Sequence, residues 1–187
     1  RLKRKAELNT LQAQITPHFL YNTLNTIKCL ARIRGEEKIY SITVNLIRLL
    51  QFSISEKEEF VTVEKEIEIV KSYIFLQLLA HDDKFKVKLE IEPEVLQYRI
   101  LKMILQPLVE NALLHGINPG RGDGIITIRV YRDGNILYSV IQDNGRGMDE
   151  KTIKEILSND RERTGRRFSG IGVYNVNERI KMHFGEK

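Results

Sequence analysis

Two short segments in the second half of the sequence hold residues suited to binding a nucleotide. Asp143 begins a D-x-G-x-G pattern at the end of an expected strand, where its carboxylate can accept a hydrogen bond from an exocyclic amine such as that of adenine. Within this pattern, Gly145 and Gly147 let the backbone turn sharply and approach a ligand closely. Further on, Gly170 and Gly172 precede an expected helix, whose free N–H groups suit a phosphate.

A third segment is an expected helix that carries Asn111 and His115 on one face, four residues apart. The amide oxygen of Asn111 is a hard ligand suited to a magnesium ion that bridges phosphates. Each of the three segments alone is a weak signal, because glycine-rich patterns often form only turns. Their order along the chain, each at a junction between elements, favours a nucleotide site. His115 could contact a phosphate or could be an ordinary histidine at a helix end.

A separate candidate, His18, lies near the start of the sequence in the stretch Pro17–Asn25. It shares a helical stripe with Asn22, and a polar stripe in an apolar-rich helix is costly unless it is paired or exposed. Pro17 removes a backbone donor just before His18 and is well suited to the first position of a helix. These residues alone leave open whether His18 is reactive or is a hydrogen-bonded histidine in a kinked bundle.

The elements that must position these residues follow from hydrophobic periodicity. Apolar residues at spacings of three and four predict helices over 2–34 and 36–53, and Gly35 is the expected stop between them. Such an αα-hairpin cannot cover its own apolar stripes, so we expect it to dimerise into a four-helix bundle. The remaining strands and helices are expected at 60–63, 64–79, 85–91, 100–115, 126–130, 136–140, 150–157 and 171–183. Pro107 must sit early in its helix or kink it.

The segments around Asn111, Asp143 and Gly170, in that order along the chain, resemble the motifs of the ATP-binding fold shared by gyrase, Hsp90, MutL and histidine kinases. Within that fold, the stretches 17–25, 110–117 and 170–180 closely resemble the LytS/YesM-type sensor histidine kinases of two-component systems, and the resemblance covers nearly the whole chain. It implies an α+β fold, in which a helical hairpin over 1–55 carries the phosphoacceptor histidine and dimerises. An α/β two-layer sandwich of the histidine-kinase/Hsp90-like ATPase type, over 56–187, would bind ATP.

The resemblance also assigns roles to individual residues. It makes His18 the phosphoacceptor, whose neutral imidazole attacks the γ-phosphate of ATP, with Asn22 one turn away able to orient the ring. It places magnesium at Asn111 and adenine recognition at Asp143. Lid contacts would come from the glycines at 145, 147, 170 and 172, and the lid itself from residues 148–169. The phosphoryl group would then pass to an aspartate on the receiver domain of a response regulator.

Two departures from related proteins bear on the mechanism. Other histidine kinases often carry a carboxylate directly after the histidine, whereas this chain has Phe19, so the proton acceptor is undetermined. Gyrase-like ATPases carry a water-activating glutamate four residues before the asparagine, and this chain has Pro107 there. Pro107 and the histidine motif therefore argue against the first alternative, an ATPase that drives a conformational clamp. The intact Asn111, Asp143 and glycines argue against the second, a scaffold without activity.

Composition and charge set the remaining expectations. The chain is 42% hydrophobic and 29% charged, with a net charge of +5 spread along its length, and it shows no basic face or aromatic platform for binding nucleic acid directly. Its one cysteine, Cys29, excludes an internal disulfide, fits a reducing compartment and is expected to be packed. No stretch approaches the length of a membrane span. The basic start at Arg1–Lys5 fits a helix descending from the cytoplasmic side of a membrane.

From the family pattern we expect further segments beyond both ends of this sequence. Relatives carry a sensor and transmembrane helices upstream, and their ATP-binding domain continues with two more strands. We therefore expect this chain to be the cytoplasmic portion of a bacterial inner-membrane sensor protein, with its membrane contact confined to upstream segments.

Overall fold

The computed structural model describes residues 17–55, 58–117, 122–157 and 171–185. The backbone contacts divide the chain into two compact units, Arg1–Glu56 and Lys57–Lys187. The first contains only helices in its described part, and the second combines helices with two small sheets. The mixed helix-and-sheet fold expected from the sequence is therefore confirmed. None of the helices in these described ranges is both long and apolar enough to span a bilayer.

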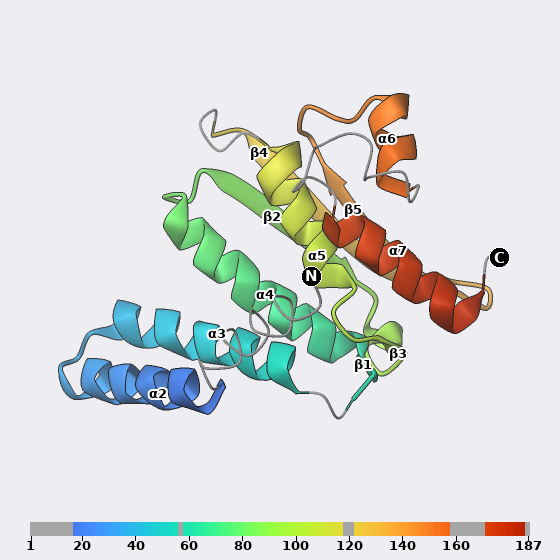
Figure 1. Cartoon of the computed structure of the whole chain (residues 1–187). Coiled ribbons are helices and arrows are strands. Elements are labelled where there is room, and N and C mark those ends of the chain that lie inside the picture. Colours follow the sequence, from blue (N-terminus) through green and yellow to red (C-terminus); the bar gives the residue numbers. More distant parts are fainter. Residues whose placement is uncertain (1–16, 56–57, 118–121, 158–170, 186–187) are drawn as a thin grey trace, which may run out of the picture. The chain divides into compact units, whose positions relative to one another are not determined.

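The first unit is an antiparallel pair of helices, α2 (Pro17–Ile33) and α3 (Glu37–Ile54), which lie side by side in Figure 1. Gly35 ends α2 as expected, because it has a φ of +68°, a conformation that glycine adopts without strain. The N–H of Glu36 reaches back to the carbonyl of Ala31 at 2.9 Å, which is the six-to-one bond of a Schellman motif. The part of the first helix expected before Pro17 lies outside the described residues.

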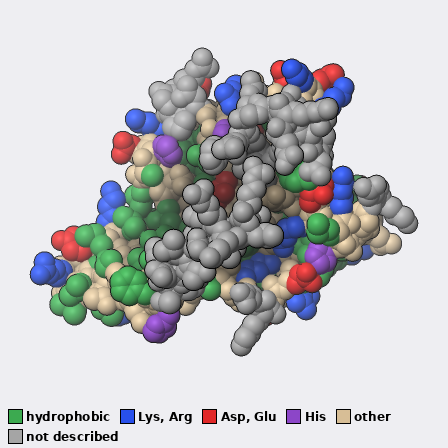
Figure 2. All heavy atoms as spheres, viewed as in Figure 1, with side chains coloured by type: hydrophobic (Ala, Val, Ile, Leu, Met, Phe, Trp, Pro, Cys, Tyr) green, Lys and Arg blue, Asp and Glu red, His purple; other side chains and the backbone are tan. Residues whose placement is uncertain are grey.

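Many apolar side chains of this hairpin are exposed in the single chain. The exposed ones are Phe19, Leu20, Ile27, Leu30, Ile33, Ile39, Leu46 and Ile54. Figure 2 shows hydrophobic side chains, in green, on the surface of the hairpin. Cys29 is also exposed, so the expectation that it is packed is wrong; it lies on the outward face of α2 between exposed Ile27 and Leu30.

The second unit begins with a strand and a capped helix. Strand β1 (Phe60–Thr62) leads directly into α4 (Val63–Ala80), and the hydroxyl of Thr62 caps α4 by accepting from the N–H of Lys65 at 3.2 Å. Strand β3 (Arg99–Leu101) pairs antiparallel with β1. The helix expected from about Ile100 was therefore predicted to start too early, because this segment finds a strand partner in β1 instead.

A three-stranded sheet forms the layer beneath the helices. Its order is β2 (Phe85–Ile91), β4 (Gly124–Asp133), β5 (Ile136–Asp143), with β2 parallel and β5 antiparallel to β4. The alternating side chains of β4 point their apolar set inward, and Ile126, Ile128 and Val130 have no exposed surface. Figure 1 shows α4, α5 and α7 against one face of this sheet, which gives the expected two-layer arrangement.

The other helices of this unit complete the site. A short 3₁₀ turn over Pro93–Val95 precedes β3, and α5 (Leu105–Asn111) continues as a π-helical turn, η2 (Ala112–Gly116). Pro107 is the third residue of α5, so it sits early in the helix as expected and breaks no internal bond. Helix α6 (Glu150–Leu157) follows the D-x-G-x-G loop, and α7 (Ile171–Phe184) packs on α5 and α6.

Candidate functional site

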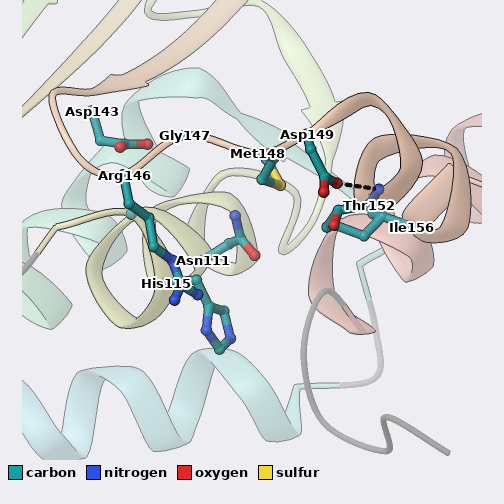
Figure 3. Close-up of a pocket in the computed structure, with 10 residues that line it drawn as sticks. Asn111, His115, Asp143, Arg146, Gly147, Met148, Asp149, Thr152 and Ile156 are labelled. Atoms are coloured by element: carbon teal, nitrogen blue, oxygen red, sulfur yellow. Dashed lines mark hydrogen bonds between the residues drawn. The ribbon is translucent and has the colours of Figure 1, made fainter. Parts of the chain in front are cut away.

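One pocket of the second unit brings together several of the residues singled out in the sequence. It has a volume of about 300 Å³, at the lower end of the range for small-ligand pockets. Helix α5, the π-turn, the loop after β5 and α6 contribute its walls, as Figure 3 shows. Its lining consists of Asn111, His115, Gly116, Asp143, Arg146, Gly147, Met148, Asp149, Thr152 and Ile156. Four of these, at 111, 115, 143 and 147, were predicted site residues.

The helix that presents Asn111 is anchored by a buried carboxylate from another helix. Glu66 of α4 has no exposed surface and accepts hydrogen bonds from the backbone N–H groups of Met103, Ile104 and Leu105, at the start of α5. Burial raises the pKa of Glu66, while these N–H groups and the charge of Arg179 oppose the increase. Glu66 thus satisfies orphan donors that no side chain of α5 itself caps.

The π-turn sets how the far end of α5 meets the pocket. The N–H of Ile117 bonds to the carbonyl of Ala112 at 3.0 Å, five residues back, instead of four as in an α-helix. Such single π-turns inside α-helices are frequent at functional sites. Here the turn contributes both His115 and Gly116 to the pocket lining next to Asn111.

Hydrogen bonds tie the D-x-G-x-G loop to itself and to the start of β4. The carboxylate of Asp143 accepts from the N–H of Gly145 at 2.9 Å. Asn144 ties the loop to the start of β4: its amide oxygen accepts from the N–H of Ile125 at 2.7 Å, and its amide nitrogen donates to the carbonyl of Asp123 at 2.9 Å. These bonds place Asp143 at the end of β5 with its carboxylate on the pocket wall.

The predicted glycines lie in different surroundings. Gly147 lines the pocket with a φ of +68°, whereas Gly145 lies just outside the lining and touches the π-turn. A Cβ at position 145 would lie only 1.9 Å from the carbonyl oxygen of Gly116. Gly172 does not line the pocket either; a Cβ there would lie 3.1 Å from Cβ of Pro107, where α7 approaches α5. Gly170 and the lid over 158–169 lie outside the described residues.

Several residues of the pocket were not found from the sequence. Figure 3 shows the side chain of Arg146 extending toward His115 and Asn111, so a cation faces the part of the pocket expected to hold phosphates. Asp149 accepts from the N–H of Thr152 at 2.7 Å and thereby begins α6. The signal for Arg146 was its place inside the D-x-G-x-G pattern, because a guanidinium is well suited to hydrogen-bond phosphate oxygens.

The carboxylate next to Asn111 in sequence points elsewhere. Glu110 accepts from the amide nitrogen of Gln106 at 2.9 Å and is not part of the pocket lining. Burial and the nearby charge of Glu110 raise the pKa of Tyr73 on α4. Position 107 is a proline that lies against α7, and Glu110 faces α4. In the described part of the chain, the carboxylates that line the pocket are therefore Asp143 and Asp149 alone.

Asn111 suits a magnesium ion that takes its other ligands from substrate phosphates and water. Its side chain lines the pocket with one hard amide oxygen. Within the described ranges, no three His, Cys, Asp or Glu side chains are grouped closely enough to hold a metal by themselves. Magnesium in phosphoryl-transfer sites takes most of its ligands from phosphates and water, so a single protein ligand is compatible with such an ion.

His18 is presented on the surface of the hairpin. It is the second described residue of α2 and is exposed, and the amide nitrogen of Asn22 lies 3.2 Å from Nδ1 and 3.3 Å from Nε2 of its ring. The amide can donate to a ring lone pair or, turned by 180°, accept from a ring N–H. Beside the ring lies a hollow of about 350 Å³ within the hairpin, lined by His18, Tyr21, Leu50, Gln51, Ile54 and Ser55.

Comparisons with known proteins place both units in established families. A profile described as "Histidine kinase" matches residues 6–85, and one described as "Histidine kinase-, DNA gyrase B-, and HSP90-like ATPase" matches residues 97–187. The sensor histidine kinase YpdA of Escherichia coli (strain K12) is 38% identical over 99% of this chain and 32% of its own length.

Two further relatives extend the comparison. The sensor histidine kinase YesM of Bacillus subtilis (strain 168) is 38% identical over 98% of this chain and 30% of its own length. The sensor protein LytS of Oceanobacillus iheyensis is 32% identical over 100% of this chain and 32% of its own length. The chain therefore spans about a third of the length of the curated relatives it matches. With both profiles matched in tandem and these relatives aligned over nearly the whole chain, the chain belongs to the LytS/YesM-type sensor histidine kinases.

Proposed function

We propose that this chain is the catalytic core of a two-component sensor histidine kinase that phosphorylates His18 with ATP. The observation that carries the proposal is the single pocket that gathers Asn111, His115 and Asp143 in one unit, while the other unit presents an exposed His18. In this proposal, residues 1–55 form the phosphoacceptor and dimerisation domain, and residues 56–187 form the ATP-binding domain. Family membership supports the activity, and the pocket supports the assignment of the substrate.

The chemistry follows from the groups that line the pocket and the hairpin. A lone pair of the neutral His18 ring attacks the γ-phosphorus, the bond from that phosphorus to the β–γ bridging oxygen breaks, and the ring loses its N–H proton. Magnesium bound through Asn111 would neutralise charge on the phosphates. Arg146 faces the same region and stabilises charge that develops on the transferred group. Asp143 accepts the exocyclic amine of adenine.

Asn22 serves to orient the acceptor ring in this scheme. If its amide donates to the nucleophilic lone pair, attack is blocked, so the productive arrangement is the one in which its oxygen accepts from the ring N–H. That arrangement fixes the tautomer, so that the other ring nitrogen carries the lone pair that attacks. The final proton acceptor then lies in the solvent or beyond this side chain, because the residue after His18 is the exposed Phe19 and supplies no carboxylate.

The same proposal accounts for the lack of a water-activating base on α5. A clamp ATPase needs a carboxylate that faces the γ-phosphate, but position 107 is a proline against α7 and Glu110 is turned toward Gln106. Phosphoryl transfer to a histidine benefits from this arrangement, since it suppresses loss of the phosphoryl group to water. The kinase therefore fits the pocket better than the clamp ATPase.

We also propose that the hairpin forms a homodimer, because it exposes apolar side chains in the single chain. Leu30 is 53% exposed and Ile33 is 81% exposed, and a second copy packed in a four-helix bundle would cover them. Light scattering on the purified chain should give a dimer. Leu30→Glu should shift the population to monomer and leave ATP affinity unchanged, whereas Arg32→Glu, a matched control on an exposed position of the same turn, should leave the dimer intact. A chain that is monomeric without substitution contradicts the bundle.

We further propose that the phosphoryl group of His18 passes to an aspartate on a response regulator receiver domain. The relatives are named as sensors, which supports a place for this core on the cytoplasmic side of a membrane-bound sensor. In this proposal ATP is its substrate, and it makes no direct contact with nucleic acid.

Autophosphorylation with γ-labelled ATP and magnesium tests the proposal. The unmodified chain should acquire acid-labile, base-stable label, and both His18→Gln and Asn111→Ala should abolish it. The two variants should differ in nucleotide binding: His18→Gln keeps its ATP affinity, and Asn111→Ala loses affinity for ATP with magnesium. Label that persists in His18→Gln overturns the acceptor assignment, and tight ATP binding without label in the unmodified chain favours the non-enzymatic scaffold.

A further inference from the structure

Gly116 lies against the carboxylate that the proposed function uses to recognise adenine. It is the last residue of the π-turn η2 and lines the pocket beside Asp143. A Cβ at position 116 would lie 2.6 Å from Cγ and Oδ1 of Asp143 and 2.8 Å from Oδ2. These separations are well below ordinary contact distance, so the carboxylate occupies space that any side chain at position 116 would need.

The backbone around this contact leaves Asp143 little room to move. Its Oδ1 accepts from the N–H of Gly145 at 2.9 Å, which ties the carboxylate to the loop. The carbonyl of Gly116 accepts from the N–H of Arg146 at 3.0 Å, and a Cβ at position 145 would lie 1.9 Å from that carbonyl oxygen. The π-turn and the D-x-G-x-G loop therefore meet backbone to backbone, with the carboxylate fixed between them.

The π-turn is what brings position 116 to this place. Its five-residue hydrogen bond, from Ile117 to Ala112, adds one residue to the final turn of the helix. The exposed Leu114 takes the outward position of that turn, while Gly116 faces inward to Asp143. The contact is thus a property of the turn's geometry and of the missing side chain together.

We propose that Gly116 is a positioning residue that sets the base specificity of the nucleotide site. Because Gly116 lacks a side chain, the carboxylate of Asp143 can stand where it accepts a hydrogen bond from an exocyclic amine, as in ATP. At the same place, the carboxylate repels a base that carries a carbonyl oxygen, as in inosine triphosphate. This inference rests on the proposed function, because it takes the pocket to be the ATP site and Asp143 to read the base.

A side chain at position 116 should therefore weaken discrimination between ATP and inosine triphosphate, and should not weaken the binding of both nucleotides equally. A hydrogen bond to a charged acceptor is worth enough for the unmodified chain to prefer ATP to inosine triphosphate by about tenfold or more. A methyl group at position 116 displaces the carboxylate and leaves the phosphate contacts of Asn111 and Arg146 in place. ATP affinity should therefore fall by about tenfold, while affinity for inosine triphosphate should change by less than about threefold.

Calorimetric titration of the chain with both nucleotides, in magnesium, tests this inference. Gly116→Ala should bring the two affinities close together. Leu114→Ala is the matched control, because Leu114 is 65% exposed in the same turn and lies outside the pocket lining; it should keep the full preference for ATP. Equal losses for both nucleotides in Gly116→Ala, or an unchanged preference, overturn the inference. An unmodified chain that binds neither nucleotide overturns the proposed function itself.

A double variant tests whether the methyl group acts through Asp143. Asp143→Ala removes all three atoms that clash, so adding Gly116→Ala to Asp143→Ala should change neither nucleotide affinity nor melting temperature. Should Gly116→Ala alone fail to fold, recovery of the fold in the double variant supports the same contact. A double variant that remains unfolded, or that loses affinity beyond Asp143→Ala alone, shows that the methyl group strikes the backbone and overturns the inference.

Discussion

His18 and Asp143 are held by the molecule in opposite ways. His18 is exposed on a two-helix hairpin, and its ring lies within hydrogen-bond distance of the Asn22 side chain, four residues along the same helix. Asp143 stands at the end of a sheet strand, bonded to Gly145 and pressed against Gly116, in a pocket whose helix is anchored by a buried carboxylate. A group that must meet different partners needs access, whereas a group that must recognise one base needs a fixed position.

The largest expected effect is a loss of stability when Glu66, which anchors the start of α5 beneath the pocket, is replaced. Glu66→Ala leaves three backbone N–H groups at the start of α5 without their acceptor, which should lower the free energy of unfolding by on the order of 3 kcal/mol. Urea denaturation of the variant measures this change. Glu68→Ala is the matched control on the same helix, because the Glu68 side chain is 57% exposed in an i,i+3 ion pair, and it should cost less than about 0.5 kcal/mol. Similar losses in both variants contradict the anchoring role.

The next effect separates two glycines that the sequence treats alike. Gly145→Ala places a methyl group on the carbonyl of Gly116 and should weaken ATP binding by about tenfold or more, because backbone must shift beside Asp143. Gly172→Ala meets only Pro107, at 3.1 Å, and should weaken binding by less than about threefold. Titration with ATP compares the two. If Gly172→Ala weakens ATP binding more than Gly145→Ala does, the close approach at position 145 is not what shapes the pocket.

A smaller effect is expected on the exposed side. Asn22→Ala removes the neighbour that we propose orients His18, and it should slow autophosphorylation by about tenfold, because a ring held less firmly adopts the attacking orientation less often. Its melting temperature and ATP affinity should match those of the unmodified chain, since Asn22 is exposed and lies in the hairpin. Thr23→Ala, on the next exposed position, controls for a general effect on the helix and should retain full activity. An unaltered rate in Asn22→Ala contradicts the orienting role.

The smallest expected effect is a pH dependence of stability from Glu66. Burial raises its folded-state pKa above the unfolded value of about 4.3, so the folded state binds this proton more tightly. The resulting contribution to stability is complete below the unfolded pKa and is lost as pH rises through the folded-state pKa. Denaturation at a series of pH values should therefore show the unmodified chain losing stability, relative to Glu66→Gln, as pH rises from about 4. A difference that stays constant or moves the other way contradicts this assignment.

The parts of the fold that local patterns determine were predicted from the sequence. The helical spacing gave α3 and α7 to within about two residues, and alternation gave β2 and β4. The two residues between β4 and β5, Gly134 and Asn135, are of types that favour tight hairpins. The pocket residues at 111, 143 and 147 were also identified, because each stands at a junction whose residue types suit a nucleotide.

The features that could not be predicted from the sequence are β3, the burial of Glu66 and the π-turn. The first two depend on contacts between distant segments. Strand β3 is three residues long and is defined by its partner β1, some 39 positions earlier, so no local signal marks it. Glu66 lies in a run of alternating acidic and apolar residues that suggests a solvated helix face. Its burial comes from donors at Met103 to Leu105, 37 to 39 residues further on. The π-turn at 112–116 likewise leaves no pattern, because the helical spacing of apolar residues continues through it.

Phosphopeptide mapping after incubation with magnesium and ATP tests the central claim most directly. The chain has four histidines, at 18, 81, 115 and 183, so the site of modification can be assigned by mass spectrometry under alkaline conditions. The account predicts one phosphoryl group, on the peptide that contains His18, and none on the other three. A phosphoryl group on any of those three, or release of free phosphate from ATP without a modified peptide, would contradict it.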